Sequence, residues 1–281
     1  MRTLPLPAPP TGAVLAACIA GVTDPGLVLR LGAVGPALGN SANAYVQHAQ
    51  ARSLHLVPRV ANLGAVSGDE LRGLYSNYMS ATRGSARTYY DAIRNASPNQ
   101  RCPLCGIGTV TVLDHHLPKS SYPDLSVCPA NLVPACDFCN NAKRAKYPLT
   151  AGEQTLHPYF DDYTAQQWIY ARLDTTGSPV LVFFVLPPPH WEQVDKDRVQ
   201  RHFTVVKLGH AYTSNANDDL IPLRGHLANI AAQKGTAQVQ AYLNDEMARY
   251  AGRPNSWQHV MYQTLSRDAG FVAGGYLNIP T

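Results

Sequence analysis

Two pairs of closely spaced cysteines constrain this 281-residue chain more than any other feature of its sequence. Cys102 and Cys105 form the first pair, Cys136 and Cys139 form the second, and thirty residues separate the pairs. Each pair can chelate a metal ion, and two pairs complete the closed tetrahedral shell of structural zinc. A redox dithiol explains one pair but not two. The sequence therefore predicts a Zn²⁺ ion that holds the fold and has no open position for catalysis.

The distribution of charge favours a polyanion only mildly. Residues 1–100 carry eight Lys or Arg against four Asp or Glu, and residues 101–150 carry five against three. Residues 151–281 carry ten against twelve. The basic surplus in the first half would help a nucleic acid approach, although solvated surface charge explains it nearly as well.

Hydropathy and the N-terminal residues bear on the cellular compartment. No run approaches the ~18 apolar residues that a membrane span needs. The first residues carry one arginine and are broken by four prolines, which makes a poor export signal. We therefore expect a cytoplasmic protein that does not associate with a membrane.

The segment around the second cysteine pair has the pattern of a ββα unit. Alternating β-branched residues lead to Asp114 and indicate a strand, and residues 132–135 supply a short second strand after a long loop. Residues 137–146 fit a helix. On that helix Asn140, Lys143 and Arg144 share one face.

The side chains of this unit match the needs of phosphodiester hydrolysis. That reaction requires an activated water, a cation over the phosphoryl oxygens and help for the leaving oxygen. Asp114 and Asn140 offer hard oxygen ligands for Mg²⁺ or Mn²⁺. His115, next to the carboxylate, can deprotonate water near neutral pH. Lys143 and Arg144 can clamp a phosphate.

Three nearby side chains leave alternatives open. Strict strand alternation puts His116, not His115, on the same side as Asp114, although a strand that ends at a loop need not alternate there. Lys119 is expected either to contact a backbone phosphate or to be solvated. His157 is expected to be a structural histidine, and the alternative is a third ligand of the catalytic metal.

The arrangement resembles the HNH, or ββα-metal, endonuclease family. The shared pattern is Asp-His-x-x-Pro from Asp114, then Asn131, then Cys-x-x-Cys-Asn-x-x-Lys from Cys136 to Lys143. The resemblance implies that Asp114 and Asn140 hold one catalytic divalent ion and that His115 is the general base. It implies that Asn131 is structural and braces the loop that carries the histidine. In this chain Asn140 stands where some members carry His, a variant that favours Mg²⁺-like metals.

The flanking segments are similar to a bacterial HNH group of unassigned substrate. Thr155–Asp161 is one of these segments. Some relatives of that group are nuclease subunits of anti-phage systems such as Septu and Zorya. The resemblance implies double-stranded DNA as the substrate, products with 5′-phosphate and 3′-hydroxyl ends, and an ATPase or sensor protein as a partner.

The sequence as a whole predicts an α+β protein with three regions. We expect a mainly helical region over residues 1–98, a zinc-anchored HNH core over 99–163 and a mixed α/β region over 164–281. A Pro-rich extended arm is expected before the first helix.

Local patterns predict further elements. Ser67–Glu70 has the form of a capping box that opens a helix through Met79. Gln166–Leu173 looks helical, and Val180–Leu186 reads as a buried strand. Ser256 is a plausible cap for a helix through residue 265.

Three rival functions remain. The first is a zinc module without catalysis that binds nucleic acid or a protein. The second is an RNase of the same fold, although no feature of the sequence indicates recognition of a 2′-hydroxyl. The third is a nuclease that is inactive alone and is targeted by a partner, which fits the lack of a helix-turn-helix pattern.

Overall fold

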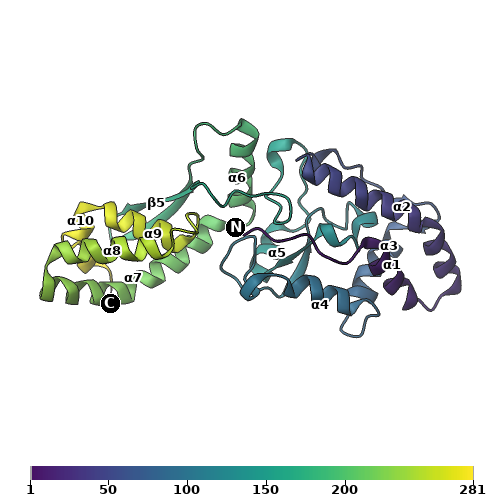
Figure 1. Cartoon of the computed structure of the whole chain (residues 1–281), viewed down its shortest axis with the longest axis horizontal. Coiled ribbons are helices and arrows are strands. Elements are labelled where there is room, and N and C mark those ends of the chain that lie inside the picture. The colour runs from purple at the N-terminus through teal and green to yellow at the C-terminus, as the bar shows by residue number, and fades with distance from the viewer. Residues whose placement is uncertain (1, 281) are drawn as a thin grey trace. The chain divides into compact units, whose positions relative to one another are not determined.

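The computed structural model describes residues 2–280, which form two compact units. Residues 2–162 make up the first unit and residues 163–280 the second. The described residues contain helices and three two-stranded antiparallel sheets, so the fold is α+β (Figure 1). The expected helical region and the cysteine-bearing segment lie within the same unit. Residues 1 and 281, the ends of the expected regions, lie outside the described residues.

The first unit begins with an extended arm that leads into two helices. The arm is anchored by backbone: Arg2 donates its N–H to the Pro103 carbonyl at 2.8 Å, and Leu4 donates to the Pro158 carbonyl at 2.9 Å. The side chain of Leu4 is buried. Helices α1 (Thr11–Ala20) and α2 (Pro25–Gln50) follow. The expected extended arm is therefore present, and it is fixed to the protein.

A capped helix continues into a π-helical turn. Ser67 caps α3 (Gly68–Gly73) through a capping box with Glu70, as the sequence predicted. The chain then runs through η2 (Leu74–Met79), in which the Ser80 N–H donates to the Tyr75 carbonyl at 2.7 Å, a five-residue step. The sequence predicted α-helix through Met79, and the structure has the wider π-turn there. Such turns are rare and are often found at functional sites.

The remaining elements before the cysteines are short. They are the strands β1 (Asn62–Leu63) and β2 (Val66–Ser67), the helix α4 (Arg87–Asn95) and the 3₁₀ turns η1 (Leu54–Leu56) and η3 (Pro98–Gln100). Buried apolar side chains of α1, α2, η2 and α4 form one core with Leu113 and Leu132. The helices therefore pack against the next hairpin.

That hairpin is followed at once by a helix. β3 (Val112–His115) pairs antiparallel with β4 (Leu132–Ala135), and α5 (Asp137–Lys143) begins two residues later. The long connection between the strands contains the 3₁₀ turns η4 (Pro123–Leu125) and η5 (Pro129–Asn131), and it is almost entirely buried. The unit ends with the 3₁₀ turn η6 (Ala151–Glu153).

The helix after the second strand is shorter than expected. The sequence predicted helix to residue 146, but α5 ends at Lys143 because Arg144 has φ 52° and ψ −143°. No right-handed helix accommodates a positive φ at a residue with a side chain. Arg144 is exposed and does not extend the helical face of Asn140 and Lys143.

The second unit contains a hairpin where the sequence predicted a helix. Gln166–Leu173 was expected to be helical, but β5 (Ile169–Asp174) occupies this segment and pairs along its full length with β6 (Val180–Val185). Six cross-strand pairs outweigh the weak local preference for helix. The run Val180–Leu186 forms a strand as expected, but it is not buried on both faces, since Val180 and Phe184 are each 38% exposed.

Helices follow this hairpin along the chain. They are α6 (Gln193–Val205), α7 (Leu208–Lys234), α8 (Thr236–Arg249), α9 (Trp257–Arg267) and α10 (Ala269–Val272), followed by the 3₁₀ turn η7 (Gly275–Asn278). Helices α6, α7 and α9 pack against the hairpin, and two further helices pack on α7 and α9. Ser256 caps α9 by accepting the His259 N–H, as predicted. Within residues 2–280 no helix combines the length and the apolar character needed to cross a membrane.

Candidate functional site

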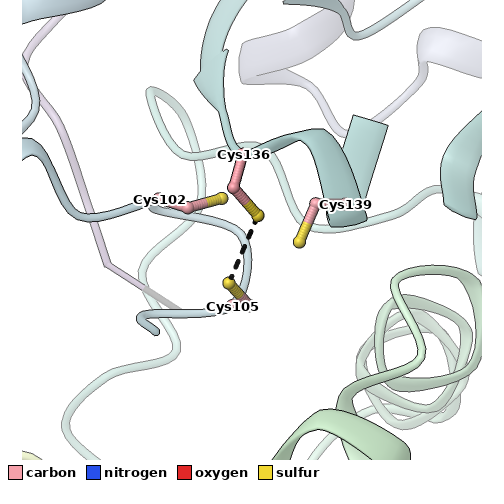
Figure 2. A group of neighbouring side chains, drawn as sticks. All are labelled: Cys102, Cys105, Cys136 and Cys139. Carbon is pink, nitrogen blue, oxygen red and sulfur yellow. Dashed lines mark hydrogen bonds between the residues drawn. The ribbon is translucent and has the colours of Figure 1, made fainter. Parts of the chain in front are cut away.

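Four buried cysteines come together beside the β3–β4 hairpin. Cys102 and Cys105 lie on a turn, Cys136 directly precedes α5, and Cys139 lies on that helix. Figure 2 shows the four sulfur atoms turned toward a common point, and all four lie within 4.8 Å of one another. The Sγ atoms of Cys105 and Cys136 are 3.9 Å apart. With Zn–S bonds of about 2.3 Å, neighbouring sulfurs of a tetrahedron lie about 3.8 Å apart.

The local backbone is shaped to bring these sulfurs together. Gly108 donates its N–H to Cys105 Sγ at 3.4 Å. A Cβ atom on Gly108 would lie 2.7 Å from Cys136 Sγ, so a side chain at this position would displace a ligand. The four thiolates and their spacing fit a structural zinc ion, as the sequence predicted.

Asp114 is a buried carboxylate held by a buried lysine. It lies on β3 opposite Val133 of β4. The ammonium of Lys143 is 3.0 Å from Asp114 Oδ2 and 3.3 Å from Oδ1, and it donates to the His115 carbonyl at 2.7 Å. Burial raises the pKa of Asp114, and the charge of Lys143 opposes that rise. Lys143 is 3% exposed, so its ammonium faces the interior and not the surface expected of a phosphate clamp.

His115 is fixed through one ring nitrogen. Its Nε2 lies 2.8 Å from the carbonyl oxygen of Ser126, which can only accept, so Nε2 carries the proton and Nδ1 keeps its lone pair. The ring packs edge-on to Tyr75 with the centroids 4.4 Å apart. Burial lowers the pKa of His115 to about 3, and the ammonium groups of Lys119 and Lys143 act in the same direction. The imidazole is therefore neutral at physiological pH.

Asn131 ties the two ends of the buried connection together. Its Oδ1 accepts the Leu117 N–H at 2.7 Å, and its Nδ2 donates to the carbonyls of Leu117 at 3.0 Å and Leu125 at 3.3 Å. Its own carbonyl accepts the His116 N–H at 2.8 Å. The fully buried amide thus braces the chain that directly follows His115.

The other predicted side chains lie on the same unit. Asn140 is half-buried, one helical turn before Lys143 on α5. Lys119 donates to Ser76 Oγ at 2.9 Å, which places its ammonium against η2. The structure therefore gathers Asp114, Lys143 and His115 at the end of β3, with Asn140 a turn away, and leaves the exposed Arg144 outside the helix.

Comparison with known proteins identifies a relative of this chain. No protein-family model and no solved structure matches the chain. The chain is 31% identical to "Protein ea31" of Escherichia phage lambda over 239 residues, which cover 79% of this chain and 80% of the phage protein. The chain belongs to the ea31 family. The name of the phage protein specifies no reaction.

In this member of the ea31 family, two tyrosines from upstream helices complete the surroundings of the site. Tyr75 of η2 packs on His115 and donates its hydroxyl to the Leu113 carbonyl at 3.1 Å. Tyr45 of α2 lies 2.9 Å from His157 Nε2. The sequence alone assigns neither tyrosine to the site. Their helical spacing indicates core residues, and no motif connects them to histidines that lie much later in the sequence.

The same contacts place the two remaining histidines. The ring of His116 packs against that of His157 at an interplanar angle of 36°, with the centroids 4.1 Å apart. His157 Nδ1 accepts the Tyr159 N–H at 3.2 Å. Backbone therefore fixes His157, the geometry expected for a structural histidine.

Proposed function

We propose that this chain is a metal-dependent HNH endonuclease that hydrolyses phosphodiester bonds in DNA. The observation that carries the proposal is the state of His115. Its Nε2 proton is committed to the Ser126 carbonyl, and Nδ1 has no hydrogen-bond partner among the described residues. A neutral imidazole with one free lone pair, adjacent in sequence to a carboxylate, has the geometry to accept a proton from water, while burial and the two nearby ammonium groups lower its pKa and make it a weaker base than a solvated histidine.

The donor set fits a hard divalent cation. Lys143 contacts both oxygens of the Asp114 carboxylate, so a bound ion would have to share this carboxylate with the ammonium or displace it. Asn140 precedes Lys143 by about one turn of α5, so the two residues share a helix face, and Lys143 contacts Asp114. Asp114 and Asn140 would hold Mg²⁺ or Mn²⁺. When bound, the ion would neutralise charge on the phosphoryl oxygens.

The chain's own groups have distinct roles in this proposal. His115 Nδ1 takes one proton of the attacking water, whose oxygen bonds to phosphorus while the bond to the 3′ oxygen breaks, and the departing 3′ oxygen takes a proton from solvent water. Asn131 keeps the histidine loop in place through its three side-chain bonds. Lys143 supplies positive charge beside the carboxylate. The products would carry 5′-phosphate and 3′-hydroxyl ends.

A second candidate is a zinc module without catalysis. It is favoured by the burial of the same residues: Asp114 is 6% exposed and ion-paired with Lys143, and Tyr75 covers one edge of His115. A buried, compensated pair can serve stability alone. The two candidates differ in whether DNA is cut and not in the zinc content.

The deciding experiment uses zinc-loaded full-length protein and supercoiled plasmid. We expect nicking or linearisation with Mg²⁺ or Mn²⁺ and none with chelator. His115→Ala should abolish cutting while one zinc per chain remains by elemental analysis. His190→Ala, an exposed histidine of the second unit, is the matched control and should cut normally. Undiminished cutting by His115→Ala would show that His115 is not the general base. Loss of cutting in His116→Gln alone would assign that role to His116.

A parallel digestion separates DNase from RNase activity. The same protein is incubated with DNA and RNA of one sequence under the metal that supports plasmid cleavage. The proposal predicts faster loss of the DNA. Preferential loss of RNA would leave the proposed hydrolysis in place but identify RNA, and not DNA, as the substrate.

A further inference from the structure

Lys119 has an unusual environment for a lysine near a surface. Its ammonium donates to Ser76 Oγ at 2.9 Å and lies 4.6 Å from the centroid of the Tyr75 ring. Among residues 2–280 no carboxylate forms an ion pair with it. Burial lowers the pKa of Lys119, and the neighbouring Arg72 lowers it further. A partly desolvated ammonium beside a second cation is a place where an anion gains energy.

The second cation comes from the helix that precedes the π-turn. Arg72 lies on α3, one turn before Ser76, and within residues 2–280 it forms an ion pair with Asp69, whose side chain is 91% exposed. An exposed pair of this kind contributes little and can be exchanged for a better anion. The Lys119 ammonium and the Ser76 hydroxyl are in contact, and the Arg72 guanidinium of α3 lies near enough to lower the pKa of Lys119.

This group of side chains lies next to the proposed base. The Tyr75 ring contacts both Lys119 and His115. Its centroid lies 4.6 Å from Lys119 Nζ and 4.4 Å from the centroid of the His115 ring. Tyr75 and Ser76 are successive residues of η2; Tyr75 is 8% exposed and Ser76 is open to solvent. A strand whose scissile phosphate is at His115 would bring a neighbouring phosphate to Lys119.

We propose that Lys119, Ser76 and Arg72 form a phosphate-binding subsite for the backbone of the nucleic acid that is cut at His115. The inference rests on the proposed nuclease function for its substrate. It assigns the helical segment α3–η2 to substrate binding as well as to the core. Phosphate contacts of this type position the strand and carry no sequence information.

Binding is measured without cleavage. The probe is a fluorescent DNA duplex, titrated with full-length zinc-loaded His115→Ala protein over a series of salt concentrations. In that background we compare Lys119→Gln, Arg72→Gln and Arg94→Gln. Arg94 is the matched control: its side chain is 30% exposed against 32% for Arg72, and each is paired with an aspartate three residues earlier.

Lys119→Gln and Arg72→Gln should each weaken binding about tenfold at low salt. Each should also make the slope of log K against log salt shallower by about one, the loss of one phosphate contact. Ser76→Ala should have a smaller effect. Lys119→Arg should restore the slope, because charge and reach are kept. Arg94→Gln should change the affinity less than twofold.

Two results would overturn the subsite. One is an unchanged affinity and salt slope in both glutamine variants, with unfolding temperatures like that of the parent. The other is a general loss in which Arg94→Gln weakens binding as much as Arg72→Gln. If plasmid is never cut but Lys119→Gln still flattens the salt slope, the nuclease proposal fails and the phosphate site stands. If plasmid is cut and the salt slopes of Lys119→Gln and Arg72→Gln are both unchanged, the nuclease proposal stands and the phosphate-binding subsite fails.

Discussion

The two longer hairpins of this protein are built in opposite ways. β3 and β4 have four residues each, and seven of the eight are buried. β5 and β6 have six residues each, and one face of their sheet remains open to solvent. The first hairpin has a long, almost wholly buried connection that contains Asp124, Ser126 and Asn131, whereas the second turns through exposed residues 175–178.

The difference shows what a functional hairpin requires of its surroundings. A buried connection must satisfy every polar group from within the protein. The β3–β4 hairpin satisfies many of these groups with the Asn131 amide and the Lys143 ammonium, and a cysteine cluster lies at its base, but Asp124 Oδ1 is left without a hydrogen-bond partner. The β5–β6 hairpin needs no such support, because water satisfies its turn. The following predictions test this contrast, beginning with the largest effect.

Removal of one zinc ligand should unfold the first unit and spare the second. In Cys136→Ser the bound zinc should be lost, and structural zinc contributes about 10–16 kcal/mol to the folding of small zinc modules. Elemental analysis and thermal unfolding followed by circular dichroism measure both effects. Cys18→Ala, at a buried cysteine outside the cluster, should retain the metal. One zinc per chain in Cys136→Ser would contradict the assignment of the four ligands.

Removal of the buried ammonium should destabilise the first hairpin strongly. Lys143→Met leaves the Asp114 carboxylate buried without a cation, which costs about 3–5 kcal/mol. The double variant Asp114→Asn/Lys143→Met should recover most of this loss, because no buried charge remains. Urea unfolding of the three proteins gives the values. A loss below about 1 kcal/mol in Lys143→Met would mean that the pair is open to water.

How much of this site could be foreseen depends on the kind of contact. The cysteine spacing, the capping box at Ser67 and the strand Leu132–Ala135 depend on neighbours in sequence, and the structure has all three. The Lys143–Asp114 pair joins residues 29 positions apart, and Tyr75 reaches His115 from a helix 40 positions upstream. Periodicity cannot say which helix covers which strand. It also failed at Ile169–Asp174, where cross-strand pairing decides the structure.

The buried connection should show a pH dependence that the exposed turn lacks. Asp124 is 7% exposed, Oδ1 has no hydrogen-bond partner, and burial raises its pKa. A carboxyl group with a raised pKa in the folded state favours folding when protonated, so its contribution is lost as pH rises through that pKa. Asp124→Asn should therefore stabilise the protein by about 1 kcal/mol at pH 7.

The same comparison at low pH provides the control for Asp124. Below the unfolded-state pKa of the carboxyl group, both proteins carry a neutral side chain, and the advantage of Asp124→Asn should vanish. Chemical unfolding of the two proteins between pH 3 and pH 7 measures the difference. A difference that does not vary with pH would show that the carboxylate is solvated.

The smallest effect is expected for a longer turn in the second hairpin. Two glycines inserted after Gly177 lengthen an exposed turn and should cost less than about 1 kcal/mol, because loop closure depends weakly on length. The same insertion after Leu125 would break the buried connection and should prevent cooperative unfolding of the first unit. Equal tolerance at both positions would remove the distinction between the hairpins.

The arm at the start of the chain has a practical consequence for anyone who prepares this protein. Arg2 donates its N–H to the carbonyl of Pro103, which follows Cys102, and Leu4 donates to the carbonyl of Pro158, so these hydrogen bonds fix the first residues to the segment that carries the first cysteine pair. An affinity tag fused directly before these residues, or removal of the first five residues to aid crystallisation, would weaken or remove these hydrogen bonds. Zinc content should be checked first in any such preparation.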